Sequence, residues 1–87
     1  MSKTIEIKKF MTKWLNLNGN ALVLFAIIWG ESKQGTQIFT DDYVHHSEAM
    51  NVSIPTYYNT LQRLVDRGII FKVDGGYKVS VELNTTA

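Results

Sequence analysis

A chain of 87 residues, 45% of them hydrophobic, with a net charge of +1, has room for one small core and excludes a two-domain protein. The absence of cysteine excludes disulfides and thiolate metal sites, and it suits the cytoplasm. No secretion signal begins the sequence, and the longest apolar run, Ala21 to Trp29, has nine residues against the roughly 20 that cross a bilayer. We therefore expect a single cytoplasmic domain over residues 1–87, with no membrane partner.

The N-terminal part of the chain predicts a strand and two helices. Residues Ile5–Ile7 alternate like a short strand. A short helix follows from the helical spacing of four apolar residues, Phe10, Met11, Trp14 and Leu15. Either Asn16 or Asn18 can cap the next helix, which carries apolar residues on every face from Ala21 to Trp29.

This apolar helix has two interpretations. It is either the central helix of the core, wrapped by the rest of the chain, or one of its stripes forms a dimer interface together with Phe10 or Trp14. A domain this small has difficulty covering nine apolar residues on all sides, which favours the second interpretation. We expect a homodimer.

The middle of the chain predicts a turn, a short strand and a third helix. Residues Gly30–Gly35 end the apolar helix, and Thr36–Phe39 form a short extended piece. Thr40 is the expected N-cap of a helix that runs through Met50, with two aspartates, Asp41 and Asp42, in its first turn, where the helix dipole favours them. One face of this helix combines Tyr43, His46, Ala49 and Met50.

The adjacent pair His45 and His46 suggests a metal site at first sight. Neighbouring residues on a helix point about 100° apart, so the two imidazoles cannot easily bind one ion. We expect His46 to be partly buried, His45 to be exposed, and no metal or cofactor to be held.

A tight connection leads into the fourth helix. Asn51 stands where a turn residue with positive φ is needed, since Asn tolerates that conformation. Ser53 is the expected N-cap of a helix over Ser53–Arg67, with Pro55 in its first turn and Gly68 at its end. The inner face of this helix carries Tyr57, Leu61, Leu64 and Val65, and the outer face carries Pro55, Thr56, Asn59, Gln62, Arg63 and Asp66.

The C-terminal part predicts a β-hairpin, with strands Ile69–Val73 and Tyr77–Leu83. A two-residue loop has two possible registers, which pair Val73 with Lys78 or Lys72 with Tyr77. Both mix apolar and charged residues on one face. We therefore expect the three-residue loop Asp74–Gly76, which pairs Val73 with Tyr77, Lys72 with Lys78 and Phe71 with Val79. The two lysines would then repel each other unless water or an anion screens them.

Two motifs resemble known proteins. The first combines the run Ser53–Tyr57 with Leu61, Leu64 and Gly68–Ile70, and it resembles the recognition-helix pattern of the winged helix-turn-helix superfamily. The second combines Leu17–Leu22, Ala26–Trp29 and Phe39-Thr40. It resembles the N-terminal winged-helix domains of replication-associated proteins, including the primosomal DnaD type, from phages and plasmids of Gram-positive bacteria.

The resemblance implies an α+β winged helix: a three-helix core with a helix-turn-helix, a short strand and a C-terminal hairpin wing over about residues 69–83, preceded by a short strand and helix. It also implies that the helix over about 53–67 enters the major groove of double-stranded DNA. The residues that the resemblance places against bases are Pro55, Thr56, Tyr58, Asn59 and Gln62. The residues that it places against phosphates are Ser53, Arg63, Lys72 and Lys78.

We expect the function to be double-stranded DNA binding, in transcriptional regulation or in replication initiation of a mobile element. The alternative is a winged helix that serves as a protein-interaction module, which the net charge of +1 and the uncharged helix face favour. Catalysis is not expected, because the chain has neither a cysteine nucleophile nor a glycine-rich phosphate loop, and no small-molecule substrate is evident.

Overall fold

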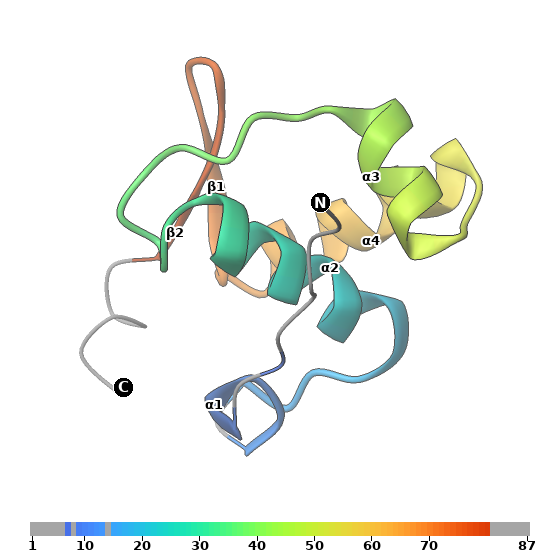
Figure 1. Ribbon diagram of the computed structural model, residues 1–87. Coiled ribbons are helices and arrows are strands. Elements are labelled where there is room, and N and C mark those ends of the chain that lie inside the picture. The colour runs from blue at the N-terminus through green and yellow to red at the C-terminus, as the bar shows by residue number, and fades with distance from the viewer. Residues whose placement is uncertain (1–6, 8, 14, 81–87) are drawn as a thin grey trace.

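Four helices and one two-stranded antiparallel hairpin make up the part of the chain that the computed structural model describes, which is residues 7, 9–13 and 15–80 (Figure 1). The elements in chain order are α1 (Lys9–Lys13), α2 (Gly19–Glu31), α3 (Tyr43–Met50), α4 (Ile54–Asp66), β1 (Ile70–Val73) and β2 (Gly76–Val79). The protein is therefore a small α+β domain. The expected strand at Ile5–Ile7, the side chains of Phe10 and Trp14 and the end of the expected second strand at Val81–Leu83 lie outside the described residues.

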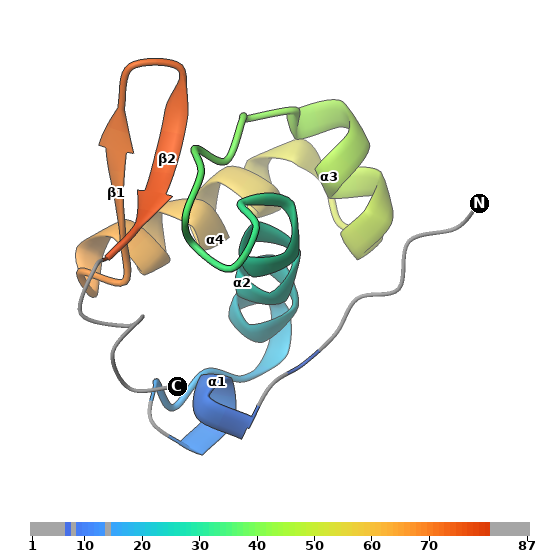
Figure 2. The same ribbon diagram turned by 60° about the vertical axis from the view of Figure 1, so that its left-hand side comes forward.

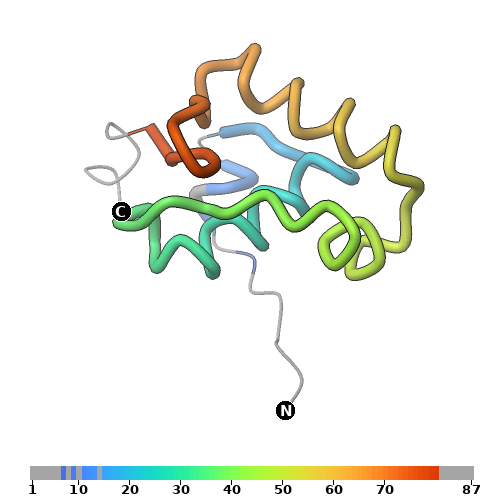
Figure 3. Tube along the Cα trace, turned by 90° about the horizontal axis from the view of Figure 1, so that it is seen from above, coloured from blue at the N-terminus to red at the C-terminus, as the bar shows by residue number. Residues whose placement is uncertain are grey.

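Helix α2 lies in the middle of the molecule, with α1 below it, α4 behind it, α3 at one end and the hairpin at the other (Figure 2). In Figure 3 the segment that links α2 to α3 passes across α2 on the viewer's side, and α4 lies along the upper edge of the view. Among the described residues, no helix has the length and apolar character that a membrane span requires.

The apolar helix is the centre of the core. Every residue from Leu24 to Trp29 is buried, and Ala21, Leu22 and Val23 pack partly buried against the same cluster. No residue of α2 is among the exposed large hydrophobic residues. One chain therefore covers this helix, contrary to the expectation, because α1, α3 and α4 pack against it. The dimer loses the packing reason for which it was expected.

Helix α3 begins later than the sequence predicted. Thr40 is not its cap: Asp42 holds the N-cap position, and its Oδ1 accepts a hydrogen bond of 3.3 Å from the backbone N–H of His45. The two aspartates therefore precede the helix instead of forming its first turn. Of the predicted inner face only His46 is fully buried, whereas Tyr43 and Ala49 are exposed.

The connection into α4 is as predicted. Asn51 adopts the left-handed conformation, with φ 59° and ψ 46°, and the side chain of Ser53 accepts the N–H of Thr56. Gly68, with φ 74°, follows the last turn of α4. The predicted inner face is confirmed, because Tyr57, Leu61 and Leu64 are buried and Val65 is half-buried.

The predicted hairpin register is wrong by one residue. The structure pairs Ile70 with Val79, Phe71 with Lys78, Lys72 with Tyr77 and Val73 with Gly76. The loop therefore has two residues, Asp74 and Gly75, and Gly75 has the positive φ of 90° that several two-residue turns need.

The register follows from a contact that local patterning does not reveal. Phe39 lies beside β2 as a short third strand, and it exchanges two backbone hydrogen bonds of 2.7 and 2.9 Å with Tyr77. A Cβ on Gly76 would lie 2.0 Å from the carbonyl oxygen of Phe39. Gly76 is therefore a strand residue selected by close backbone approach, and not a loop residue. The extended piece predicted at Thr36–Phe39 is confirmed only as this single bridge.

Candidate functional site

The first turn of α4 is fixed by its own side chains. The Ser53 hydroxyl accepts the Thr56 N–H at 3.3 Å and donates to the Thr56 hydroxyl oxygen at 3.0 Å. Both hydroxyls that were predicted to face DNA are thus engaged in capping the helix. Pro55 lies between them and is exposed.

Farther along the outer face of α4, some polar side chains have hydrogen-bond partners inside the protein and others do not. Asn59, Gln62 and Arg63 are all exposed. The Gln62 amide donates to the Asp66 carboxylate at 2.8 Å, one turn later. Within the described part of the chain, Asn59 and Arg63 have no side-chain hydrogen bond or ion pair. They are the two outer-face groups that a ligand can engage without breaking a contact inside the protein.

Tyr58 is also engaged, and its partner is a residue that sequence reasoning placed elsewhere. The Tyr58 hydroxyl donates to one carboxylate oxygen of Asp41 at 3.1 Å, and the buried Tyr57 hydroxyl donates to the other at 2.8 Å. Burial and these hydrogen bonds to the carboxylate raise the pKa of both tyrosines. Asp41 thereby connects the segment before α3 to the beginning of α4.

All four tyrosines of the chain gather around Asp41. The ring of Tyr43 lies 6.0 Å from that of Tyr58, and the Tyr57 and Tyr58 rings are 5.2 Å apart. Tyr77 completes the set from β2: its partial burial and the negative charge of Asp41 raise its pKa. No sequence signal predicted this cluster, because its hydrogen bonds join residues 16 and 17 positions apart.

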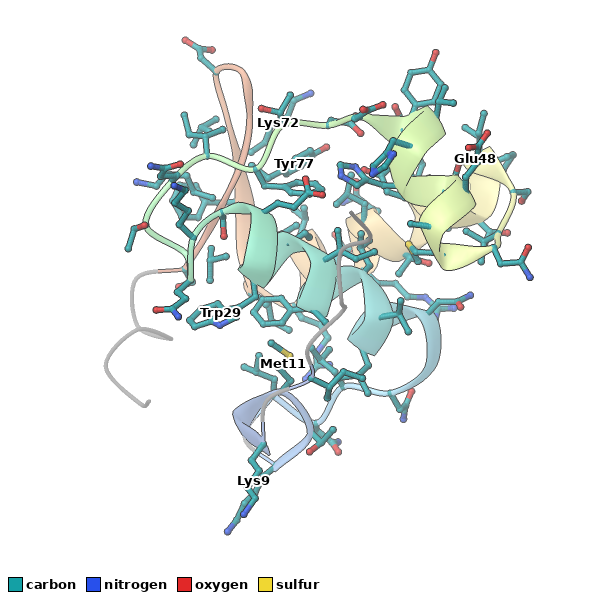
Figure 4. All side chains as sticks on the ribbon, viewed as in Figure 1. Lys9, Met11, Trp29, Glu48, Lys72 and Tyr77 are labelled. Carbon is teal, nitrogen blue, oxygen red and sulfur yellow. The ribbon has the colours of Figure 1, made fainter. Side chains whose placement is uncertain are left out.

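The two hairpin lysines lie on opposite faces. Residues that pair directly share a face and neighbours alternate, so Lys72 lies with Tyr77 and the buried pair Ile70 and Val79, whereas Lys78 lies with the exposed Phe71. Figure 4 shows Lys72 and Tyr77 on the side of the hairpin turned toward α3. The predicted juxtaposition of Lys72 and Lys78 is therefore wrong, and only Lys72 shares a hairpin face with Tyr77.

Charge is distributed unevenly over α3 and α4. The 29 residues from Gln34 to Gln62 contain no Lys or Arg and three acidic residues, Asp41, Asp42 and Glu48. Arginines begin only at the end of α4, and the guanidinium group of Arg67 donates a hydrogen bond to the carbonyl oxygen of Leu15. The first two turns of α4 therefore offer no cationic group to a phosphate.

His46 is part of the core and not of the surface. Its Nε2 lies 3.0 Å from a carboxylate oxygen of Glu31, its Nδ1 is buried without a partner, and its ring lies 4.7 Å from that of Phe39. His45 is exposed, as predicted. Within the described ranges, no group of three or more His, Asp or Glu side chains could hold a metal ion.

Comparison with known proteins yields no relative: no protein-family model matches the chain, and neither a curated protein nor a solved structure does. The residues themselves therefore carry any functional argument.

Proposed function

We propose that this protein is a winged helix that binds double-stranded DNA, with the outer face of α4 in the major groove. One observation carries the proposal: Asn59 and Arg63 lie exposed on the outer face of a helix whose inner face is buried, and neither has a partner among the described residues. The left-handed Asn51 and the Ser53 cap hold that helix in a fixed direction. The resemblance noted above associates such domains with transcriptional regulation or replication of mobile elements.

The proposed DNA contacts are of two kinds, contacts to bases and contacts to phosphates. The Asn59 amide has the donor and acceptor that match the major-groove edge of adenine. Arg63 and Lys72 are the proposed phosphate contacts, since Lys72 lies on the hairpin face that carries Tyr77 and the buried strand residues. Lys78, on the opposite face, is not part of the proposed contact. Pro55 can only pack against the groove, and Ser53, Thr56, Tyr58 and Gln62 would have to exchange existing hydrogen bonds to reach DNA.

Two phosphate contacts make binding weak and only mildly dependent on salt. Each neutralised phosphate contributes about −0.9 to the slope of log K against log salt, so the expected slope is about −2. A typical specific binder makes about 6–10 such contacts. Most of the selectivity must then come from base contacts.

The test is fluorescence anisotropy on duplexes selected from a random pool, at several salt concentrations. Lys72→Gln should weaken binding to all duplexes alike and make the slope less negative by about 1, whereas its matched control Lys78→Gln should leave the affinity and the slope unchanged. Asn59→Ala should weaken binding to the selected duplex by about 1–3 kcal/mol and leave the slope in place. If the Lys72 and Asn59 variants bind every duplex as the parent does, α4 is not a DNA surface.

A protein-interaction module is the second candidate function. The specific observation in its favour is the absence of any Lys or Arg from Gln34 to Gln62, which removes cations from α3 and from most of α4. Failure of the parent protein to bind any duplex even at low salt would favour this candidate.

A further inference from the structure

The segment before α3 and the exposed side of α4 form a surface of unusual composition. We call it the tyrosine surface and define it by Asp41, Tyr43 and Tyr58. Tyr43 and Tyr58 are 44% and 39% exposed. Their rings lie 6.0 Å apart, tilted by 37°. Two neighbouring aromatic rings are thus open to a partner.

A fixed carboxylate, that of Asp41, lies at the hydroxyl end of the Tyr58 ring. Asp41 is half-buried, and hydrogen bonds from Tyr57 and Tyr58 fix both of its oxygens in place. Within the part of the chain described here, no Lys, Arg or His lies within ion-pair distance of Asp41, and this includes Lys72 on the face of Tyr77. Partly buried charges in proteins usually have a partner of opposite sign. The Asp41 carboxylate has only neutral hydrogen-bond donors as partners.

We propose that the tyrosine surface binds an arginine side chain of a partner protein. A guanidinium group can stack on an exposed tyrosine ring and donate hydrogen bonds to a neighbouring carboxylate at the same time, because it is planar and has five donors. Each oxygen of Asp41 accepts one tyrosine hydroxyl and keeps a second acceptor site.

The charge around the surface selects a cationic partner. Asp42 precedes Tyr43, and no Lys or Arg occurs between Gln34 and Gln62. Phosphate groups are repelled by such a surface, so nucleic acid is disfavoured there. The proposal does not rest on DNA binding, because Asn59, Arg63 and Lys72 take no part in it.

The experiment uses the whole chain, labelled with 15N, and two short peptides that differ only in their guanidinium groups. The probe is acetyl-Gly-Arg-Gly-Arg-Gly-amide, and its control carries citrulline in place of both arginines, which keeps the shape and removes the charge. Titration should shift the amide signals of Asp41, Tyr43 and Tyr58 with the arginine peptide, and binding of the citrulline peptide should be at least about five-fold weaker.

Variants of the protein distinguish a specific arginine site from non-specific electrostatic attraction of the peptide. Asp41→Asn should weaken binding of the arginine peptide at least about five-fold, whereas Glu48→Gln, which removes the same charge from an exposed position on α3, should leave it within about two-fold. Tyr43→Leu should weaken it about three-fold. Because Tyr43 is exposed, this variant keeps the test valid if Asp41→Asn disturbs the fold.

Three results would overturn the proposal. The first is equal binding of the citrulline and arginine peptides. The second is an equal loss in Glu48→Gln and Asp41→Asn, which would show that only overall charge matters. The third is a set of shifts at Tyr43 and Tyr58 caused by duplex DNA but not by the arginine peptide, which would assign the surface to nucleic acid.

Discussion

The two ends of α4 differ in what surrounds them. At its beginning lie Asp41 and three of the four tyrosines, and no Lys or Arg occurs from Gln34 to Gln62. At its end lie Arg63, Arg67 and the hairpin that carries Lys72 and Lys78. The surroundings of a single helix therefore change from acidic and aromatic to basic along its length. Exposure of a helix face therefore does not by itself define one binding surface.

The two ends also differ in how much of their hydrogen bonding is already used. At the first end, Ser53, Thr56 and Tyr58 have partners inside the protein, and these bonds fix the helix in place. At the second end, Gln62 and Arg67 also have partners, but Arg63 has none among the described residues. We assign the first end to structure and to an arginine-bearing partner, and the second end to phosphate.

The largest expected effect breaks the hairpin end. In Gly76→Ala, the new Cβ would lie 2.0 Å from the carbonyl oxygen of Phe39, so either β2 or the Phe39 segment must move. We expect a loss of about 3 kcal/mol or more in the free energy of unfolding, measured by urea denaturation.

Gly75→Ala is the matched control for this change. Gly75 also has a positive φ, of 90°, but no atom lies within 4 Å of a Cβ built there. Only the backbone cost of about 1–2 kcal/mol is then expected. Equal losses in the two variants would show that Gly76 is selected for its backbone conformation and not for the approach of Phe39.

The next effect concerns the tyrosine end. Tyr57→Phe removes a hydrogen bond of 2.8 Å from a buried hydroxyl to Asp41, and we expect a loss of about 2 kcal/mol at pH 7. Thermal and urea denaturation measure it. The matched control is Tyr43→Phe, which removes a hydroxyl from an exposed tyrosine of the same cluster, with an expected change below about 0.5 kcal/mol.

The pH dependence of stability tests the same hydrogen bond. Burial and the bond to Asp41 raise the pKa of Tyr57 above the ordinary tyrosine value of 10.0. Above pH 10 the unfolded chain therefore loses this proton while the folded chain keeps it, so stability falls as the pH rises. The parent protein should lose stability more steeply above pH 10 than Tyr57→Phe. Parallel curves for the two proteins would contradict the assigned bond.

The smallest expected effect concerns the left-handed turn at Asn51, before α4. Asn51 has φ 59° and ψ 46°, a conformation that glycine adopts freely and a β-branched residue does not. Asn51→Gly should change the free energy of unfolding by less than about 0.5 kcal/mol, whereas Asn51→Val should lower it by about 1–2 kcal/mol. Thermal melts in which valine is no worse than glycine would contradict the left-handed turn.

Sequence predicted the parts of this fold that depend on neighbouring residues. The turn at Asn51, the Ser53 cap and the helix end at Gly68 each result from local backbone preferences, and all three are present. The buried side of α4 follows from its spacing. Such features need no knowledge of the rest of the chain.

The errors arose where distant residues decide the structure. The hairpin register depends on Phe39, more than thirty residues before Gly76, and alternation within the hairpin alone favoured the wrong pairing. Asp41 was predicted to lie in a first helical turn because two aspartates suit a helix N-terminus, but its carboxylate is used by two tyrosines of α4. The candidate site was therefore predictable as a helix face, but not in the bonds that already occupy it.

The bond from Arg67 to the carbonyl oxygen of Leu15 bears on the order of folding. It joins residues 52 positions apart, so it closes a long loop and can form only after α2, α3 and α4 have come together. The segment before α2 should then be the last described part of the core to become protected from hydrogen exchange during refolding. In the native protein, its amides should be among the first to exchange, before those of α2.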